Sequence, residues 1–327
     1  MSNTLKLLTI LADGHFHSGA SIGAALGISR SAVWKQINTL KDKGVECYSV
    51  PGKGYRLATP LELLGSEQIT SRMDTDSLDL LSALEIYQDI PSTNRYLMAR
   101  AGAVRSGHAC FAERQSAGRG RRGRPWVSPF GRNIYLSLYW EYALSPSDLS
   151  GLALAVGVGV VEALQALGVN DAQLKWPNDV LWQRRKLAGI LLEMSGESAG
   201  PYHVVVGVGL NVDMCRRQSQ QIDQPWADLR SASGGDVSRN TVAALLLGSL
   251  LKVLDRYEHE GFSAFQSAWQ GLDAFAGETV VLQMPNGCLT GQACGVDQSG
   301  ALMLKTAQGV QHFHSGEVSL RPREALG

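Results

Sequence analysis

The residues best suited to chemistry are three glycines and four arginines that alternate in one short segment, Gly118-Arg119-Gly120-Arg121-Arg122-Gly123-Arg124. Glycines let backbone N–H groups approach phosphate oxygens, and guanidinium groups add bidentate hydrogen bonds and charge. An enzyme that joins a carboxylate to ATP brings two anions together and needs cations where phosphate charge develops. The segment therefore predicts an anion-binding loop. A disordered arginine-glycine loop that binds nucleic acid is the alternative.

The same glycines also match Gly-x-Gly-x-x-Gly, the pattern of dinucleotide-binding folds. In that fold a helix follows the glycines directly. Here Pro125 and the segment Ser128-Pro129-Phe130-Gly131 intervene before the next expected strand, and the sequence contains no Walker lysine motif. Rossmann and kinase interpretations are therefore excluded.

Two further motifs each place a lysine at the end of an expected strand: Lys175-Trp176-Pro177-Asn178-Asp179 and Lys186-Leu187-Ala188-Gly189-Ile190. The ammonium of Lys186 is a compact point charge that can serve both a carboxylate and an α-phosphate. Asp179 can hold a magnesium ion or orient an incoming amine. Taken singly, either residue is as typical of a surface salt bridge.

The first 60 residues predict three helices followed by a hairpin. Ser18 is expected to cap a second helix that ends at Gly27, and Ser29 a third whose Val33, Ile37 and Leu40 share one face. Residues 45–50 and 55–57 then flank the turn 51–54, as two strands with a basic tip. This order resembles a winged helix-turn-helix.

Charge supports nucleic-acid binding by this segment. Residues 1–60 hold seven basic and three acidic side chains, whereas the whole chain has 30 of each. A local basic patch is what phosphate attraction requires. The side chains expected to contact DNA are Arg30, Ser31, Lys35, Asn38, Lys41 and Lys53, with base selectivity assigned to Ser31, Lys35 and Asn38. A small helical protein-interaction domain with a solvated basic face is the alternative.

Beyond residue 85, short β-rich segments alternate with helices, which indicates a mixed sheet in one α/β domain that ends near residue 272. Strands are expected at 85–89, 109–113, 133–140, 174–176, 186–193 and 204–208, and helices at 149–167 and 241–257. Four more strands, at 279–284, 289–296, 301–305 and 310–314, are separated by short turns and predict a small β-barrel.

Cysteine use and hydropathy favour a reducing cytoplasm and no membrane span. The five cysteines are scattered and form no Cys-x-x-Cys pair. The most apolar segment, 152–161, is about half of the roughly 20 residues that a membrane span requires, so we expect it to be a buried helix.

Four motifs together resemble those of biotin protein ligases: Ser92-Thr93-Asn94, the glycine-arginine loop, and the two lysine motifs. With the winged helix in front, the chain resembles the two-function group that also represses the biotin operon. The resemblance implies an α+β multidomain architecture: a winged helix-turn-helix domain at 1–62, a mixed α/β catalytic domain similar to class II synthetases at 63–272, and an SH3-like β-barrel at 273–327.

The resemblance also implies which residues form the site. The biotin ureido ring is assigned to Ser92, Thr93, Asn94 and Gln115, and the rest of biotin to Arg119, Gly120, Arg121 and Lys186. ATP and the adenylate are assigned to Gly118, Arg121, Arg124, Trp126, Lys175, Asn178, Lys186 and Asn211, with Trp126 stacked on adenine. The catalytic set is Lys186, Arg121, Arg119 and Asp179, and Glu317 and Arg321 are expected near the nucleotide. Pro125 stands where the family often has lysine.

The implied reaction forms biotinyl-5'-AMP from biotin and Mg-ATP, then transfers biotin to a lysine of the biotin carboxyl carrier protein of acetyl-CoA carboxylase. Operator DNA and a second copy of the chain are the other expected partners, with the adenylate as corepressor. The protein is expected to fix no metal of its own, beyond Mg²⁺ near Asp179, because His312 and His314 lack a third ligand. A lipoate ligase and a ligand-sensing repressor without catalysis are the alternatives.

Overall fold

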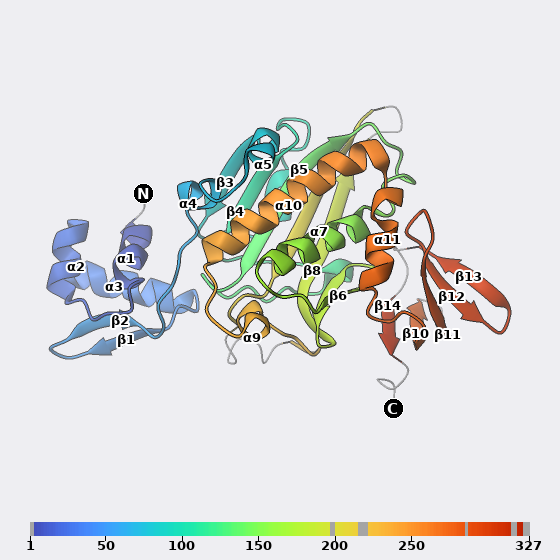
Figure 1. Ribbon diagram of the computed structural model, residues 1–327. Helices are drawn as coiled ribbons and strands as arrows, with labels where there is room; N and C mark the ends of the chain where they lie inside the picture. Colours follow the sequence, from blue (N-terminus) through green and yellow to red (C-terminus); the bar gives the residue numbers. More distant parts are fainter. Residues whose placement is uncertain (1–2, 197–199, 215–221, 285–286, 315–318, 323–327) are drawn as a thin grey trace.

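The computed structural model describes residues 3–196, 200–214, 222–284, 287–314 and 319–322, the last four as backbone only. Figure 1 shows a helical N-terminal unit, a large central sheet covered by long helices, and a small C-terminal sheet at the opposite end. The three-part architecture expected from the sequence is confirmed.

The N-terminal unit is a winged helix. It consists of α1 (Asn3–Leu11), α2 (Gly19–Leu26), α3 (Arg30–Asp42), β1 (Cys47–Val50) and β2 (Gly54–Leu57). Both predicted caps form, because Ser18 Oγ accepts a hydrogen bond from Ser21 N and Ser29 Oγ accepts one from Ala32 N. Gly27 ends α2 at φ 66°, a left-handed conformation that favours glycine. The hairpin strands pair antiparallel; β1 is two residues shorter than the predicted 45–50, and β2 is one residue longer than the predicted 55–57.

The central domain is built on a seven-stranded mixed sheet in the order β3-β4-β5-β9-β8-β7-β6. Its strands are β3 (Ala83–Tyr87), β4 (His108–Ala112), β5 (Ile134–Tyr142), β6 (Ala172–Lys175), β7 (Asp179–Trp182), β8 (Arg185–Ser195) and β9 (Tyr202–Leu210). Only β3 and β4 run parallel. The mixed sheet and its six predicted strands are confirmed, whereas β7 was missed because it has only four residues and begins two positions after Pro177.

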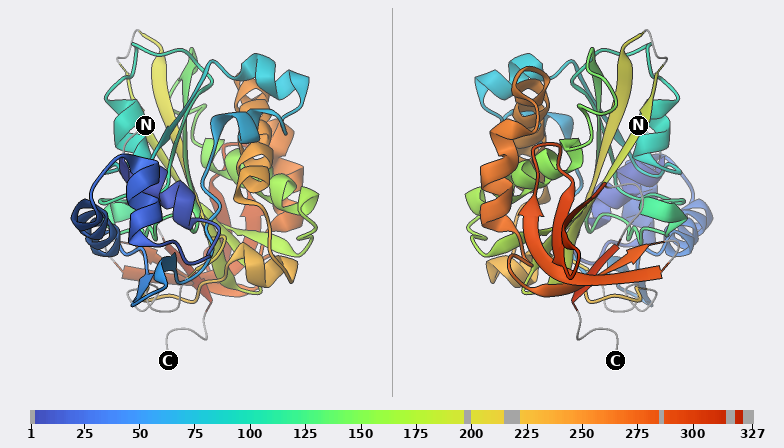
Figure 2. Two further views of the ribbon diagram at one scale, coloured as in Figure 1. Left: turned by 90° about the vertical axis from the view of Figure 1, so that its left-hand side faces the viewer. Right: turned by 90° about the vertical axis from the view of Figure 1, so that its right-hand side faces the viewer.

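Helices cover both faces of this sheet (Figure 2). The predicted helices are α7 (Leu152–Ala166) and α10 (Arg239–Glu260), which bury one face. The opposite face carries α6 (Thr93–Met98), packed with Cys110, Tyr139 and Val205. The remaining helices are α4 (Ser66–Thr70), α5 (Thr75–Leu80), α9 (Leu229–Ser233) and α11 (Ser263–Leu272). No helix in the described ranges is long and apolar enough to cross a membrane.

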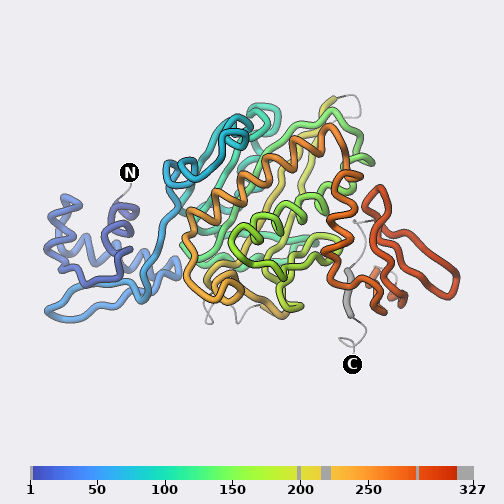
Figure 3. The backbone as a smooth tube through the Cα atoms, viewed as in Figure 1, coloured from blue at the N-terminus to red at the C-terminus, as the bar shows by residue number. Residues whose placement is uncertain are grey.

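The segment that connects the wing to the central domain can be followed in Figure 3, and buried polar groups bind it to that domain. Glu113 accepts a hydrogen bond from Leu64 N at 2.6 Å and forms an ion pair with Arg239 at 2.8 Å. These two side chains are only 4% and 5% exposed. Phe130, from the central domain, is buried in the same cluster as the winged-helix core. Through Phe130, the winged helix therefore packs against the central domain.

The C-terminal sheet has five antiparallel strands in the order β13-β12-β11-β10-β14. They are β10 (Thr279–Met284), β11 (Gly287–Val296), β12 (Leu302–Thr306), β13 (Gly309–Phe313) and β14 (Ser319–Pro322). The last predicted strand, 310–314, ends one residue earlier than expected, at Phe313, so His314 lies outside it. His312 Nδ1 lies 2.6 Å from Asp297. Glu317 lies outside the described residues, and the backbone of Arg321 pairs with Val281.

Candidate active site

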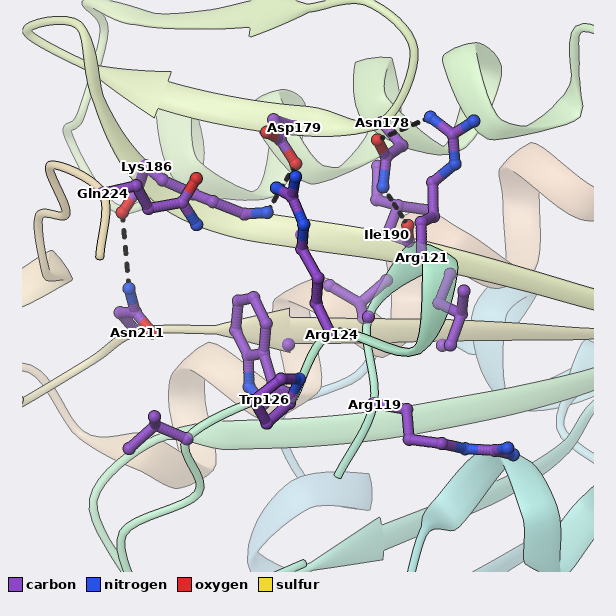
Figure 4. A pocket seen from close by; sticks show the side chains of 18 of the residues that line it. Arg119, Arg121, Arg124, Trp126, Asn178, Asp179, Lys186, Ile190, Asn211 and Gln224 are labelled. Carbon is purple, nitrogen blue, oxygen red and sulfur yellow. Dashed lines mark hydrogen bonds and ion pairs between the residues drawn. The ribbon is translucent and has the colours of Figure 1, made fainter. Parts of the chain in front are cut away.

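A cavity of about 320 Å³ opens on the central sheet. This is large enough for a small-molecule ligand. Of the residues that the sequence assigned to catalysis, to biotin and to ATP, all but Gly118 line it: Ser92, Thr93, Asn94, Gln115, Arg119, Gly120, Arg121, Arg124, Trp126, Lys175, Asn178, Asp179, Lys186 and Asn211. Segments far apart in the sequence thus meet in one place (Figure 4). Which side chain contacts which substrate remains a prediction.

The glycine-arginine segment is a structured turn. Gly120 N donates to Arg124 O at 2.7 Å, and Trp126 N donates to Gly118 O at 2.9 Å. Gly118 therefore closes the base of the loop and does not line the cavity. A single 3-10 turn, Arg121–Gly123, occupies the tip, so no dinucleotide-type helix follows the glycines.

Two arginines of the loop point in different directions (Figure 4). Arg119 forms an ion pair with Glu193 at 3.3 Å, and Arg121 donates to Asn178 Oδ1 at 3.3 Å. Burial lowers the pKa of Arg121, the charge of Arg122 lowers it further, and Asp179 opposes both. An anion bound beside Arg121 would relieve this cost of burying its charge.

Lys186 and Asp179 form the closest ion pair of the cavity. Lys186 Nζ lies 2.6 Å from Asp179 Oδ1, and the two side chains are 16% and 15% exposed. The same ammonium lies 5.4 Å from the centre of the Trp126 ring. Lys186 therefore stands between a carboxylate and an aromatic face, partly shielded from water, where its charge acts more strongly than in bulk solvent.

Trp126 rests on two glycines of adjacent strands, Gly189 and Gly209, which are paired across β8 and β9. A Cβ atom at Gly209 would lie 2.5 Å from the indole, and one at Gly189 would lie 3.0 Å from it. The glycines thus make the space for the ring. Its Nε1 is buried and has no hydrogen-bond partner within the described part of the chain, which leaves a donor for a ligand.

The Ser92-Thr93-Asn94 motif begins α6, since Ser92 Oγ accepts a hydrogen bond from Arg95 N as the helix cap. Gln115 Oε1 accepts from Thr93 N at 2.8 Å and from Thr93 Oγ1 at 3.1 Å. The motif therefore caps a helix and lines the cavity at once. These short polar groups can both donate to and accept from a ligand.

Three residues that were not predicted surround Asn94: two form hydrogen bonds with it and the third, a glycine, leaves room for it. Ser137 Oγ lies 2.5 Å from Asn94 Oδ1, and Asn94 Nδ2 donates to Glu193 at 2.9 Å. A Cβ atom at Gly207 would lie 2.2 Å from Asn94 Oδ1. Glu193 therefore connects this polar end of the cavity to Arg119 of the loop.

The two asparagines assigned to ATP, Asn178 and Asn211, bind backbone as well as lining the cavity. Asn178 Nδ2 donates to Ile190 O at 2.7 Å, and Asn211 Nδ2 donates to Lys186 O at 3.3 Å and to Ala227 O at 3.0 Å. Both therefore fix strand β8. Four further lining residues that the sequence did not single out are Ile222, Asp223, Gln224 and Trp226.

The predicted DNA-contact residues lie on the winged helix. Arg30, Ser31, Lys35 and Lys41 are exposed on α3, Asn38 is half-buried there, and Lys53 is exposed in the turn between β1 and β2. The structure thus places them on the two elements that such domains direct toward DNA.

A winged helix joined to a cation-rich cavity on a mixed sheet defines a regulator that also carries a site for an anionic ligand. Comparison with known proteins agrees. Residues 86–211 match the biotin/lipoate A/B protein ligase family, 3–56 match an HTH domain, and 275–321 match the biotin protein ligase C-terminal domain.

Individual relatives agree over most of the chain. The bifunctional ligase/repressor BirA of Escherichia coli is 42% identical over 98% of each chain, and BirA of Bacillus subtilis is 30% identical over 94% of this chain and 95% of its own. A solved biotin protein ligase from Aquifex aeolicus, in complex with biotin and ATP, superposes with a TM-score of 0.65 at 31% identity, over 74% of this chain and 100% of its own. The chain belongs to the biotin protein ligase family, in its bifunctional ligase/repressor group.

Proposed function

We propose that this protein activates biotin with ATP and transfers it to a lysine of a biotin carrier protein. The observation that carries this is the cavity in which the polar Ser92-Thr93-Asn94 end, the glycine-arginine loop and the Lys186–Asp179 pair meet. The polar end suits the ureido ring of biotin, which offers two N–H donors and one carbonyl acceptor. The cationic end suits the carboxylate and the phosphates.

In the first step a carboxylate oxygen of biotin attacks the α-phosphorus of ATP, and the bond to the β-phosphate oxygen breaks to release pyrophosphate. Lys186 and Arg121 stabilise the negative charge that develops on the α-phosphate. Trp126 stacks on adenine and positions the nucleotide, an interaction worth about 1–3 kcal/mol. In the second step a carrier lysine attacks the acyl carbon and AMP leaves, so no covalent enzyme intermediate is needed.

Magnesium fits this site as a companion of ATP. Two carboxylates, Asp179 and Asp223, line the cavity. Asp179 is the one assigned to magnesium, and its charge is balanced by Lys186. The described residues contain no cluster of three or more metal-ligating side chains. Bound Mg²⁺ would neutralise phosphate charge. The protein's own contribution is to orient both substrates and exclude water.

The winged helix makes the protein a repressor in the same proposal. The adenylate acts as corepressor, favours a homodimer, and lets two winged helices occupy a two-fold operator. The carrier is the biotin carboxyl carrier subunit of acetyl-CoA carboxylase, in the cytoplasm. Domain boundaries near residues 62 and 272 separate DNA binding, catalysis and the C-terminal module.

Biotin-dependent exchange of labelled pyrophosphate into ATP tests the activation step, followed by transfer of biotin to a purified carrier domain. We expect exchange with biotin and none with lipoate. Exchange with lipoate alone would indicate a lipoate ligase. Absence of exchange, together with biotin-dependent DNA binding, would indicate a repressor without catalysis.

A further inference from the structure

Within the described residues, the exposed large aromatic side chains all lie on the winged helix. Five large hydrophobic side chains are exposed within the described ranges, and the two aromatic ones are Trp34 at 56% and Tyr48 at 50%. Trp34 lies on α3 and Tyr48 on β1 of the wing. Isolated exposed apolar residues are common on protein surfaces. Exposed aromatic side chains that occur only on the two elements predicted to face DNA indicate a function in DNA binding.

Trp34 belongs to a row of exposed or half-buried residues that runs along α3. Residues three or four apart lie on one side of a helix, so Arg30, Trp34, Asn38 and Lys41 form this row. The neighbouring Val33, in contrast, is fully buried in the domain core. The indole therefore stands between a predicted phosphate-binding arginine and a predicted base-reading asparagine.

Charge favours DNA as the group that covers Trp34. The segment Arg30–Asp42 contains three basic side chains and one acidic one, Asp42 at its end. A second copy of this basic face would repel the first, whereas phosphates on both sides of a groove attract it. The major groove admits a helix, and the N-terminal part of a recognition helix reads the bases there. Trp34 is the fifth residue of α3.

Resting on the repressor function proposed above, we propose that Trp34 reads thymine in the operator by packing its indole against the 5-methyl group. Indole has one N–H donor, no acceptor and a large apolar face, so it cannot form the bidentate pairs that recognise guanine or adenine. The thymine methyl is the apolar group that base pairs present in the major groove. This adds an apolar specificity determinant to Ser31, Lys35 and Asn38.

The test begins with operator selection from a random duplex pool by the full-length protein in the presence of biotin and ATP. Each thymine of the selected operator is then replaced singly by deoxyuridine, which removes only the methyl group. We expect one thymine in each half-site at which this weakens wild-type binding about fourfold, the value of one buried methyl-sized group. Binding is measured at low salt, where weakened variants still bind.

The Trp34→Ala variant should bind the selected operator roughly tenfold more weakly or worse, as truncating a central aromatic contact does. It should lose the deoxyuridine effect at that position, whereas Trp34→Phe should keep it. Lys41→Ala is the matched control on the same helix: it should bind more weakly with a shallower salt dependence and an unchanged deoxyuridine effect. Biotin ligation by all three variants should equal that of the wild type.

An equal deoxyuridine effect in wild type and Trp34→Ala would overturn the inference, as would wild-type binding insensitive to every substitution. Loss of ligation in Trp34→Ala would indicate damage to the fold, and Trp34→Phe would then decide, because loss of its deoxyuridine effect rejects the inference. A wild-type protein that ligates biotin but selects no operator would refute the repressor function itself, a result distinct from failure of Trp34 alone.

Discussion

Two glycines of β9, Gly207 and Gly209, separate the biotin end of the proposed site from the ATP end. They face the same side of the strand, because side chains alternate along it. A Cβ atom at Gly209 would lie 2.5 Å from Trp126, and one at Gly207 would lie 2.2 Å from Asn94. Alanine at Gly209 should therefore displace Trp126, which we propose stacks on adenine. Alanine at Gly207 should displace Asn94, which we propose binds the ureido ring.

The displacement can be worked from contact distances. Ordinary contact for a Cβ begins at 3.4 Å. Either alanine therefore forces its neighbour to move by about 1 Å, a misplacement that can cost about 100-fold in rate. We expect Gly209→Ala to lower kcat/KM for ATP by about this factor and to change biotin affinity less than about twofold. Gly207→Ala should do the reverse.

Pyrophosphate exchange measures both effects, with ATP varied at saturating biotin and then biotin varied at saturating ATP. Gly271→Ala is the matched control, since a Cβ there meets nothing within 4 Å. It should leave both parameters unchanged. Equal effects of Gly207→Ala and Gly209→Ala on the two substrates, or an unchanged kcat/KM for ATP in Gly209→Ala, would refute the assignment of the two ends.

Three further predictions follow from charged groups. Lys186→Met should slow exchange by about 100- to 1000-fold in a folded protein, because it removes a charge aimed at the developing oxyanion, and a near-wild-type rate would contradict this. Arg239→Met leaves Glu113 buried without its cation and should lower the free energy of unfolding, measured in urea, by about 3–5 kcal/mol. A decrease below about 1 kcal/mol would show that the pair does not stabilise the fold. Burial raises the pKa of the Asp297 carboxyl, but hydrogen bonds from Ser299, His312 and Ala301 outweigh it and lower that pKa to about 2. Because this folded pKa lies below the usual 3.8, the stabilisation is present above pH 4 and lost as pH falls toward 2. The difference in Tm between wild type and Asp297→Asn should shrink over that range, and a constant difference would contradict the prediction.

Local sequence signals predicted the winged helix well. Ser18, Gly27 and Ser29 form cap hydrogen bonds with residues three or four positions away, so their positions define where α2 begins and ends and where α3 begins. The long apolar helices were also predictable, because α7 and α10 each repeat a buried pattern over many residues. The ends of these helices were harder to predict, and α10 extends beyond the predicted 241–257 at both ends.

Site residues with reactive side chains could be predicted, whereas those that create space or fix a neighbour could not. Gly207 and Gly209 matter through the atoms they lack, which no motif of side chains reveals. Glu193 and Ser137 reach Asn94 only after β8 and β5 have joined one sheet. The Arg239–Glu113 pair likewise joins residues more than 100 positions apart, which local patterns do not connect.

A crystal structure with biotin and a non-hydrolysable ATP analogue tests the central claim most directly. The account predicts the biotin ring beside Ser92, Thr93 and Asn94, the carboxylate and α-phosphate at Lys186, and adenine on Trp126, beneath the glycine-arginine loop. Ligands bound elsewhere, with residues 118–124 directed into solvent, would contradict it.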